Sequence, residues 1–325
     1  MNDSLPCVSI CTIVKNRVYS IRRCIESVLN QDYPNIEYVI QDGASTDGTF
    51  EILREYERLY PDKIHLVSIQ DNRGEEGYFR CLRRCRGEII GICLSDDELL
   101  PFAASWAVKN MALYPRAAAI YGGIYYSDID GHIIGRDSHP PSFNIDDYIC
   151  HKFNIPNAAA FFRRECLHKI GLMQENWRMD VGDFEIWTRL GMDYPIKSIS
   201  EIVAKYNIDP VSASSKPDTY LEIIKPTKQL MEEIFSNPCT PSQIRVLEQR
   251  AYAGLHLWVG FSLLNTNKKN LVWKQIIQSL HYKPEFRFLS LVTLHALYKT
   301  IIPRDQFFRS MYRKLKSKKI LLQNS

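Results

Sequence analysis

The sequence has no uninterrupted apolar run of about 18 residues, the length that a membrane-spanning helix needs. Its first residues, MNDSLPCVSI, contain no basic segment followed by an apolar core, so we expect no secretory signal. Nine cysteines occur among the 325 residues, but none forms a CxxC pair. An odd count without that spacing predicts reduced, buried thiols instead of disulfides or a zinc site. These absences favour a folded cytoplasmic protein.

The sequence also lacks the short motifs of several common enzyme classes. It has no G-x-G-x-x-G for a dinucleotide, no G-x-x-x-x-G-K-[ST] for a P-loop and no G-x-S-x-G nucleophile elbow. The eight histidines show neither H-E-x-x-H nor H-x₃₋₅-H spacing, so the usual zinc patterns are missing. A nucleotide or metal site, if present, must therefore use other residues.

The net charge of +4 is unevenly distributed. Seven basic residues and one acidic residue between Ile301 and Ser325 give that stretch a charge of +6, which leaves −2 for residues 1–300. A second basic cluster, residues 73–86, lacks the interleaved aromatic residues and extended basic surface of a nucleic-acid interface. We therefore predict no nucleic-acid partner.

Strand-like and helix-like segments alternate through the first 125 residues. The predicted strands are 7–14, 36–41, 64–69, 89–94 and 118–125. The predicted helices between them are 21–29, 49–60, 78–85 and 102–113. Short joints between such segments predict a mostly parallel sheet covered by helices on both faces. A hairpin turn is expected at Asp130-Gly131, a further helix at 183–190, and consecutive helices beyond about residue 217.

One carboxylate lies where a predicted strand meets a glycine turn. In QDGASTDGT, residues 41–49, Asp42 closes the strand. Ligands bind at the carboxyl ends of the strands in an open parallel sheet, where Asp42 can accept hydrogen bonds from a nucleobase or ribose. Gly43 permits close approach and a positive φ. Turn chemistry is the alternative; we assign Asp42 to binding and Asp47 to capping the next helix.

A second acidic site follows another predicted strand. Asp96 and Asp97 come after the apolar run that starts at Ile89 in EIIGICLSDDELLP. Adjacent carboxylates repel unless a cation or solvent relieves them, and Mg²⁺ and Mn²⁺ prefer oxygen ligands, including substrate phosphates. We therefore predict Mg²⁺ or Mn²⁺ on Asp96 and Asp97. A solvated acidic loop is the alternative, and Glu98 is expected to be a first-turn charge of the next helix.

Two further positions complete the candidate site. Arg73 lies in the loop after the third predicted strand, and its guanidinium suits a phosphate. Asp183 begins the helical pattern in MDVGDFEIWTRLG, where a helix N-terminus stabilises an anion. Asp183 is either a cap or a base held ionised in a cleft, and its spacing leaves both open.

Four segments, taken in order and with their spacing, resemble glycosyltransferase family 2. They are VSICTIVKN (8–16), QDGASTDGT (41–49), RGEIIGICLSDDELLP (86–101) and GDFEIWTRLG (182–191). The resemblance covers residues 5–215. It implies a GT-A fold, which is α/β with a Rossmann-like, mostly parallel sheet flanked by helices. It also implies inverting transfer of a sugar from a nucleotide-diphospho-sugar to a hydroxyl acceptor.

The resemblance also implies roles for single residues. The positions that match nucleotide-sugar contacts are Thr12, Val14, Asp42, Arg73 and Asp96. Asp96 and Asp97 match the metal motif, and Asp183 matches the general base. A UDP-sugar is the family's default donor, and the acceptor is expected to be a glycan or a lipid-linked sugar in cell-surface polysaccharide or glycolipid synthesis. Residues 1–215 would form the catalytic domain and 216–325 a helical extension.

Three positions depart from the family pattern. Leu94 occupies the first acidic position of the metal motif, Gly182 replaces the glutamate of a Glu-Asp pair, and Asp209 stands where many relatives have histidine. These departures motivate an alternative function: a catalytically silent protein of the same fold that binds a sugar nucleotide or a partner. A sugar nucleotidyltransferase is disfavoured because no glycine-rich basic phosphate loop occurs near the N-terminus.

The C-terminal stretch predicts a basic amphipathic helix. Its apolar residues are Phe307, Phe308, Met311, Tyr312 and Leu315, and the basic residues around them are Arg309, Arg313, Lys314 and Lys316. Such a helix can lie on an anionic membrane, or it can dock on the protein itself. The expected location is therefore cytoplasmic, with peripheral contact at the inner face of the cell membrane as one of these two possibilities.

Overall fold

The computed structural model describes residues 5–71, 74–173, 182–208, 217–265 and 269–282. Contacts divide the chain into two compact units, Met1–Glu248 and Gln249–Ser325. The helices just after residue 216 therefore belong to the first unit. The functional boundary expected near residue 215 stays a prediction.

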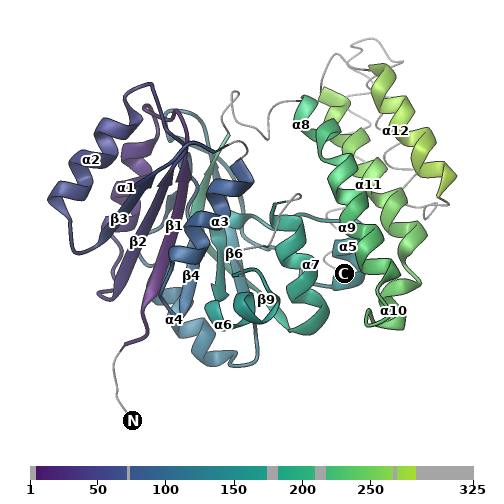
Figure 1. Cartoon of the computed structure of the whole chain (residues 1–325), viewed down its shortest axis with the longest axis horizontal. Helices are drawn as coiled ribbons and strands as arrows, with labels where there is room; N and C mark the ends of the chain where they lie inside the picture. The colour runs from purple at the N-terminus through teal and green to yellow at the C-terminus, as the bar shows by residue number, and fades with distance from the viewer. Residues whose placement is uncertain (1–4, 72–73, 174–181, 209–216, 266–268, 283–325) are drawn as a thin grey trace. The chain divides into compact units, whose positions relative to one another are not determined.

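The first unit is built on a nine-stranded sheet (Figure 1). Its strands are β1 (Val8–Val14), β2 (Ile36–Asp42), β3 (Ile64–Ser68), β4 (Ile89–Ile92), β5 (Glu98–Leu99), β6 (Ala119–Ser127), β7 (Ile133–Asp137), β8 (Ala160–Arg163) and β9 (Ile196–Asn207). They follow the order β3-β2-β1-β4-β8-β6-β9-β5, and β7 pairs with β6. Strands β1 to β4 are parallel, whereas β8 is antiparallel to both β4 and β6. The predicted fold class is confirmed, but the sheet is mixed beyond β4.

Helices cover both faces of this sheet. Those of the first unit are α1 (Ile21–Leu29), α2 (Thr49–Leu59), α3 (Gly74–Arg84), α4 (Ala103–Leu113), α5 (Ile145–Ile149), α6 (Arg164–Lys169), α7 (Asp183–Asp193), α8 (Pro217–Glu222), α9 (Ile224–Ser236) and α10 (Ser242–Arg245). The inward residues of α1, α2 and α4 share one core cluster with strand residues such as Ile10. Its neighbour Cys11 instead faces Cys81 of α3 and Cys85, the residue just after that helix. Because successive strand residues point to opposite faces, α3 covers the other side.

The long strand β9 was not predicted. Its sequence, IKSISEIVAKYN, is rich in lysine, serine and glutamate and buries few apolar side chains, among them Val203 and Ala204. It pairs in parallel with β6 and antiparallel with β5. These partners stabilise β9 through backbone hydrogen bonds, and a local hydrophobic pattern does not report such bonds.

One edge of the sheet brings together the strand ends that lie next to the predicted site residues. The carboxyl ends of β1 and β2 lie side by side, with Val14 opposite Asp42, and β4 joins them with Ile92 opposite Cys11. Because β8 runs antiparallel to β4, the residues just before Ala160 lie at this same edge. Residues that follow β2 and β4, and those that precede β8, are therefore neighbours across the sheet. We call this the carboxyl edge.

The second unit contains a helical pair. Helix α11 (Glu248–Ser262) leads through a short 3₁₀ turn (Leu263–Asn265) to α12 (Lys269–His281). The buried His256 and Gln275 join the two helices, with 2.6 Å between Nδ1 and Oε1. No helix among the described residues is long and apolar enough to cross a membrane. The predicted amphipathic helix at 307–316 lies outside the described residues.

Candidate active site

Asp42 is fully buried at the carboxyl edge, and the protein's own hydroxyls contact its carboxylate. Ser45 Oγ donates to Oδ1 and Ser68 Oγ donates to Oδ2, each at 2.5 Å. The backbone N–H of Ser45 also donates to both oxygens, at 3.3 Å to Oδ1 and 3.2 Å to Oδ2, so the protein's own donors engage the acceptor positions of this carboxylate and fix its orientation. The positive φ predicted for Gly43 occurs one residue later, at Ala44 (φ 58°).

Gly43 is instead required for close packing. A Cβ added there would lie 3.3 Å from both Asp71 Oδ2 and Lys15 Cδ. Asp71 forms an ion pair with Arg80, and burial raises the pKa of Asp71 although Arg80 opposes it. Sequence reasoning missed Asp71 and Lys15. Their positions, directly after β3 and β1, were the available signal.

The two residues assigned to the nucleoside lie on β1 with little exposure. The side chain of Thr12 is fully buried, and its hydroxyl donates to the carbonyl oxygen of Cys93 at 2.6 Å. Val14 accepts a backbone hydrogen bond from Gly43 at 2.9 Å. Thr12 therefore joins β1 to the segment after β4, and its role toward a nucleoside stays a prediction, as does that of Val14.

Asp97 is buried, whereas Asp96 is half-buried. Asp97 Oδ1 accepts from the backbone N–H of Asn207 at 3.1 Å, but Oδ2 has no hydrogen-bond partner among the described residues. Burial, and then the charge of Asp96, raise the pKa of Asp97 well above its usual value. An unpaired buried carboxylate oxygen beside a second carboxylate fits a divalent cation, because the cation would supply the missing partner.

Glu98 is not a first-turn helix charge as predicted. It lies in the short strand β5, and α4 begins only at Ala103. Its carboxylate pairs with Lys205 Nζ at 2.8 Å and with Arg23 Nε at 3.7 Å. Pairing of β5 with β9 thus positions Glu98, and local sequence could not reveal that contact.

Asp183 is the first residue of α7, as the periodicity predicted. Its Oδ2 accepts a hydrogen bond from Asn157 Nδ2 at 2.7 Å. Burial raises the pKa of Asp183, and the bond from Asn157 opposes that rise. Asn157 is the first residue of the short 3₁₀ turn (Asn157–Ala159) that leads into β8, so this bond places Asp183 at the carboxyl edge. Tyr78 of α3 is close enough to Asp183 for the carboxylate's charge to contribute to the raised pKa of the phenol.

The structure thus places Asp42, Asp96 and Asp183 at one edge of one sheet. Their roles stay predictions. Arg73 and Asp209 lie outside the described residues. Asp47 holds the start of α2, because its Oδ1 accepts from the backbone of Thr49 at 3.0 Å, in keeping with a structural assignment.

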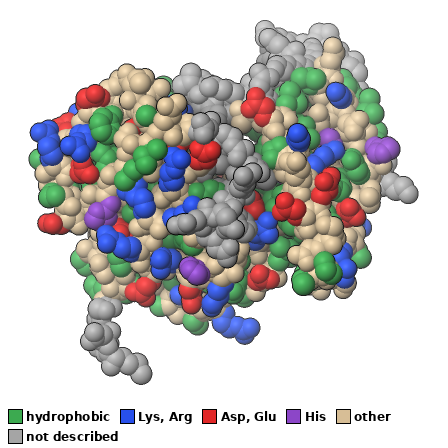
Figure 2. Space-filling model, in the orientation of Figure 1, with side chains coloured by type: hydrophobic (Ala, Val, Ile, Leu, Met, Phe, Trp, Pro, Cys, Tyr) green, Lys and Arg blue, Asp and Glu red, His purple; other side chains and the backbone are tan. Residues whose placement is uncertain are grey.

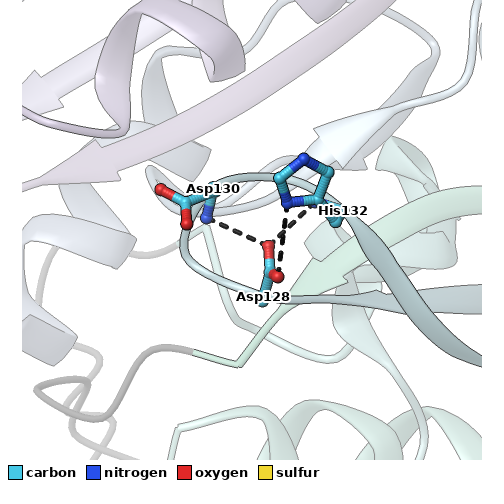
Figure 3. Close-up of side chains that lie close together, drawn as sticks. All are labelled: Asp128, Asp130 and His132. Atoms are coloured by element: carbon cyan, nitrogen blue, oxygen red, sulfur yellow. Dashed lines mark hydrogen bonds and ion pairs between the residues drawn. The ribbon is translucent and has the colours of Figure 1, made fainter.

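A further acidic group closes the hairpin between β6 and β7 (Figure 3). Asp128, Asp130 and His132 have potential ligand atoms within 4.8 Å of one another. Asp128 Oδ1, however, accepts from the backbone N–H groups of Asp130 at 3.1 Å and His132 at 2.9 Å. These bonds are typical of an Asx turn and account for Asp128 at this hairpin.

Comparison with known proteins identifies the family. Residues 9–171 match Glycosyl transferase family 2. The putative teichuronic acid biosynthesis glycosyltransferase TuaG of Bacillus subtilis is 35% identical over 219 residues, which cover 66% of this chain and 84% of TuaG. Escherichia coli chondroitin synthase is 29% identical over 203 residues, which cover 61% of this chain but only 28% of that protein.

A solved structure of similar fold supports the same assignment. The mannosyltransferase PcManGT from Pyrobaculum calidifontis, solved with GDP-Man and Mn²⁺, has a TM-score of 0.59 and 19% identity. The match covers 95% of this chain and 84% of that one. At this identity the likeness shows the fold alone. The match over residues 9–171 and the similarity to TuaG lead to one conclusion: the chain belongs to glycosyltransferase family 2.

Proposed function

We propose that the chain is an inverting glycosyltransferase that moves a sugar from a nucleotide-diphospho-sugar to a hydroxyl acceptor. The observation that supports this most directly is the half-buried carboxylate of Asp183, held by Asn157 at the edge where Asp42 and Asp96 also lie. A base must lie beside the bound donor, and the carboxyl edge is where an open sheet binds ligands.

In this mechanism Asp183 accepts the proton of an acceptor hydroxyl. The acceptor oxygen forms a bond to the anomeric carbon while the opposite bond, from that carbon to the diphosphate oxygen, breaks. The electron pair of the broken bond leaves with the nucleoside diphosphate, so the anomeric configuration inverts. Burial of Asp183 raises its pKa and brings it closer to neutral pH, which makes the carboxylate a stronger base.

Asp42 and the neighbouring strand ends are proposed to hold the nucleotide. Asp96 and Asp97 would hold Mg²⁺ or Mn²⁺, and the unpaired Oδ2 of Asp97 supports this placement. A bound cation there would offset the charge of the departing diphosphate. We propose UDP as the nucleotide of the donor. GDP-sugars should be tested beside UDP-sugars, because PcManGT was solved with GDP-Man.

The proposed pathway is synthesis of a cell-surface polysaccharide or glycolipid. TuaG and chondroitin synthase, whose names refer to polysaccharides, support this assignment. The acceptor would be a growing glycan or a lipid-linked sugar. We further propose a cytoplasmic location with contact between the basic segment 307–316 and an anionic membrane surface, supported by the charge of +6 between Ile301 and Ser325.

Substitution Asp183→Asn tests the mechanism. Loss of base catalysis should lower turnover ~10²–10⁴-fold while the protein remains folded, because the amide is similar in shape. In the unsubstituted enzyme the rate should fall as the pH drops through the raised pKa of Asp183, since only the carboxylate accepts a proton. Donors are first found by thermal shift with UDP- and GDP-sugars, with and without Mn²⁺. Turnover of Asp183→Asn near the wild-type value would remove Asp183 from the mechanism.

The alternative, a silent binder of the same fold, has structural support at one position. Gly182 has a φ of 62°, and a Cβ there would meet no atom within 4 Å among the described residues. The glutamate of the family pair is thus replaced by a residue without a side chain. A purified sample decides between the two functions, because a silent binder shows neither transfer nor hydrolysis of any donor that it binds.

A further inference from the structure

A hydrogen-bond chain connects three side chains at the N-terminus of α7. Trp187 Nε1 donates to Asn157 Oδ1 at 3.0 Å, and Asn157 Nδ2 donates to Asp183 Oδ2 at 2.7 Å. The indole N–H can only donate, so it fixes which end of the Asn157 amide faces Trp187. The NH₂ group must then face Asp183. The orientation of this amide therefore follows from the chemistry of its two partners.

The residues of this hydrogen-bond chain are held by core packing and by two separate backbone segments. Trp187 is fully buried and packs against Tyr121 and Phe162, with ring centroids 5.8 Å and 4.7 Å away. Asp183 lies four residues before Trp187, one turn away on the same helix face. Asn157 comes from a different segment, the 3₁₀ turn that leads into β8. The two hydrogen bonds thus join the start of α7 to the start of β8.

We propose that Asn157 is a positioning residue for the base. Its amide, locked by Trp187, sets the direction of the Asp183 carboxylate and keeps that carboxylate ionised. This inference rests on the proposed function only in that Asp183 is the base.

The surroundings of Asp183 explain why such a donor is needed. Burial favours the neutral acid, and among the described residues the phenols of Tyr78 on α3 and Tyr148 on α5 lie close enough for the charge of Asp183 to contribute to their raised pKa. The imidazole of His151 stacks on the next residue, Phe184, at 4.4 Å, and burial lowers the pKa of His151 to about 3, so it is neutral. Asn157 is the neighbouring side chain that holds the pKa of Asp183 down. A hydrogen bond to a charged group is stronger than a neutral one and has this effect.

The test measures the ionisation of Asp183 directly. Protein labelled with ¹³C at the aspartate carboxyl carbons is titrated by NMR, and the signal missing from Asp183→Asn identifies Asp183. Asn157→Leu keeps the size of the side chain but removes the donor and leaves no room for a water to replace it. We expect the pKa of Asp183 to rise by about one to two units, the equivalent of one lost hydrogen bond to a charged group.

Two further variants sharpen the test. Trp187→Phe keeps the aromatic packing and removes only the N–H, so the amide of Asn157 loses its lock and the pKa of Asp183 should rise by less. Asn110→Leu is the matched control, because Asn110 is also buried and donates to a tryptophan residue, the carbonyl oxygen of Trp106, at 2.9 Å. It should leave the pKa of Asp183 unchanged. Trp187→Phe also serves as the test if Asn157→Leu does not fold.

The outcomes separate this inference from the proposed function. A raised pKa in Asn157→Leu and Trp187→Phe, but not in Asn110→Leu, supports the positioning role whether or not transfer is found. The inference is overturned if the pKa of Asp183 is unchanged in Asn157→Leu or in Trp187→Phe, or if it rises equally in Asn110→Leu. If a donor is found, the acidic limb of the kcat/KM profile should move to higher pH by the same amount in Asn157→Leu. If Asp183→Asn is inactive but the acidic limb of the kcat/KM profile stays at the same pH in Asn157→Leu, the positioning role of Asn157 is rejected. The assignment of Asp183 as the base then stands.

Discussion

At the scale of single residues, three carboxylates at the carboxyl edge have different environments. Within the described part of the chain, Asp42 accepts from two serine hydroxyls, Asp97 keeps one oxygen unpaired, and Asp183 accepts a side-chain hydrogen bond from Asn157. A carboxylate already held by hydroxyls can orient a ligand. One with an unpaired buried oxygen can bind a cation, and one raised in pKa by burial can accept a proton. The surroundings, more than the residue type, assign the role.

Alanine substitutions at the acidic pair test the cation assignment. Asp96→Ala and Asp97→Ala should weaken binding of the nucleoside diphosphate when Mn²⁺ is present, because the cation links protein and phosphate. Asp97→Ala should also lower the free energy of unfolding by ~1–3 kcal/mol, since the buried N–H of Asn207 loses its partner. Calorimetric titration with and without Mn²⁺ measures the first effect, and denaturant unfolding measures the second.

Asp128→Ala serves as the control for this pair. Its carboxylate is engaged in the hairpin turn, so the substitution should leave the Mn²⁺-dependent affinity as it is. Unchanged affinity in both strand-end variants, together with a loss in Asp128→Ala, would move the cation to the hairpin and refute the assignment.

At the scale of elements, close packing between strands keeps the carboxyl edge in register. Gly91 of β4 lies between Ile10 of β1 and Phe161 of β8. An added Cβ would stand 2.5 Å from Phe161 Cε1 and 2.8 Å from Ile10 Cδ1, which are impossible distances without movement. The glycine thus lets two large side chains meet across the strand that leads to Asp96. In the sequence, Gly91 is visible only as an interruption of the apolar run that starts at Ile89.

Gly91→Ala should therefore destabilise the first unit. Overpacking of a core costs about 1–3 kcal/mol in free energy of unfolding, and chemical denaturation measures the loss. Gly135→Ala in β7 is the matched control, because a Cβ there would meet Tyr126 at ordinary contact distances of 3.5 Å and 3.8 Å. Equal stability of the two variants would show that β1, β4 and β8 can shift to accept a methyl group.

At the scale of the whole molecule, charge is divided between body and tail. Residues 1–300 carry a charge of −2, and the visible described surface shows Lys and Arg among Asp and Glu without a continuous patch of one sign (Figure 2). Residues 301–325 carry +6. We therefore assign the proposed contact with an anionic membrane to residues 301–325, since polybasic segments add about 1 kcal/mol per residue near such a membrane.

A chain that ends at Ile302 should lose affinity for vesicles that contain phosphatidylserine, while the full chain should bind them and be released by salt. Co-sedimentation measures both, and neutral phosphatidylcholine vesicles provide the control. If the two forms sediment equally, the tail has no part in membrane contact.

The first half of the fold could be predicted because its signals are local. Helix α1 buries Ile21, Cys24, Ile25 and Val28 at helical spacing, and β1 and β2 are rich in β-branched and aromatic residues. Strands β5 and β9 were missed because their backbones are stabilised by partners distant in sequence. Asn157 was missed for a related reason: it is one of two asparagines in NIPNAAA (154–160), with no repeat or spacing to mark it.

Sequence by itself determined the family, the alternation of strands and helices, and the strand-end positions of Asp42 and Asp96. It could do so because periodicity and turn residues act over a few neighbours along the chain. Only the tertiary structure decided that β8 reverses against β4 and brings Asn157, 26 positions earlier in the chain, to Asp183. It also decided which carboxylates are buried and which oxygens remain unpaired. Burial and hydrogen-bond pairing depend on contacts between distant segments, and such contacts exist only once the sheet has assembled.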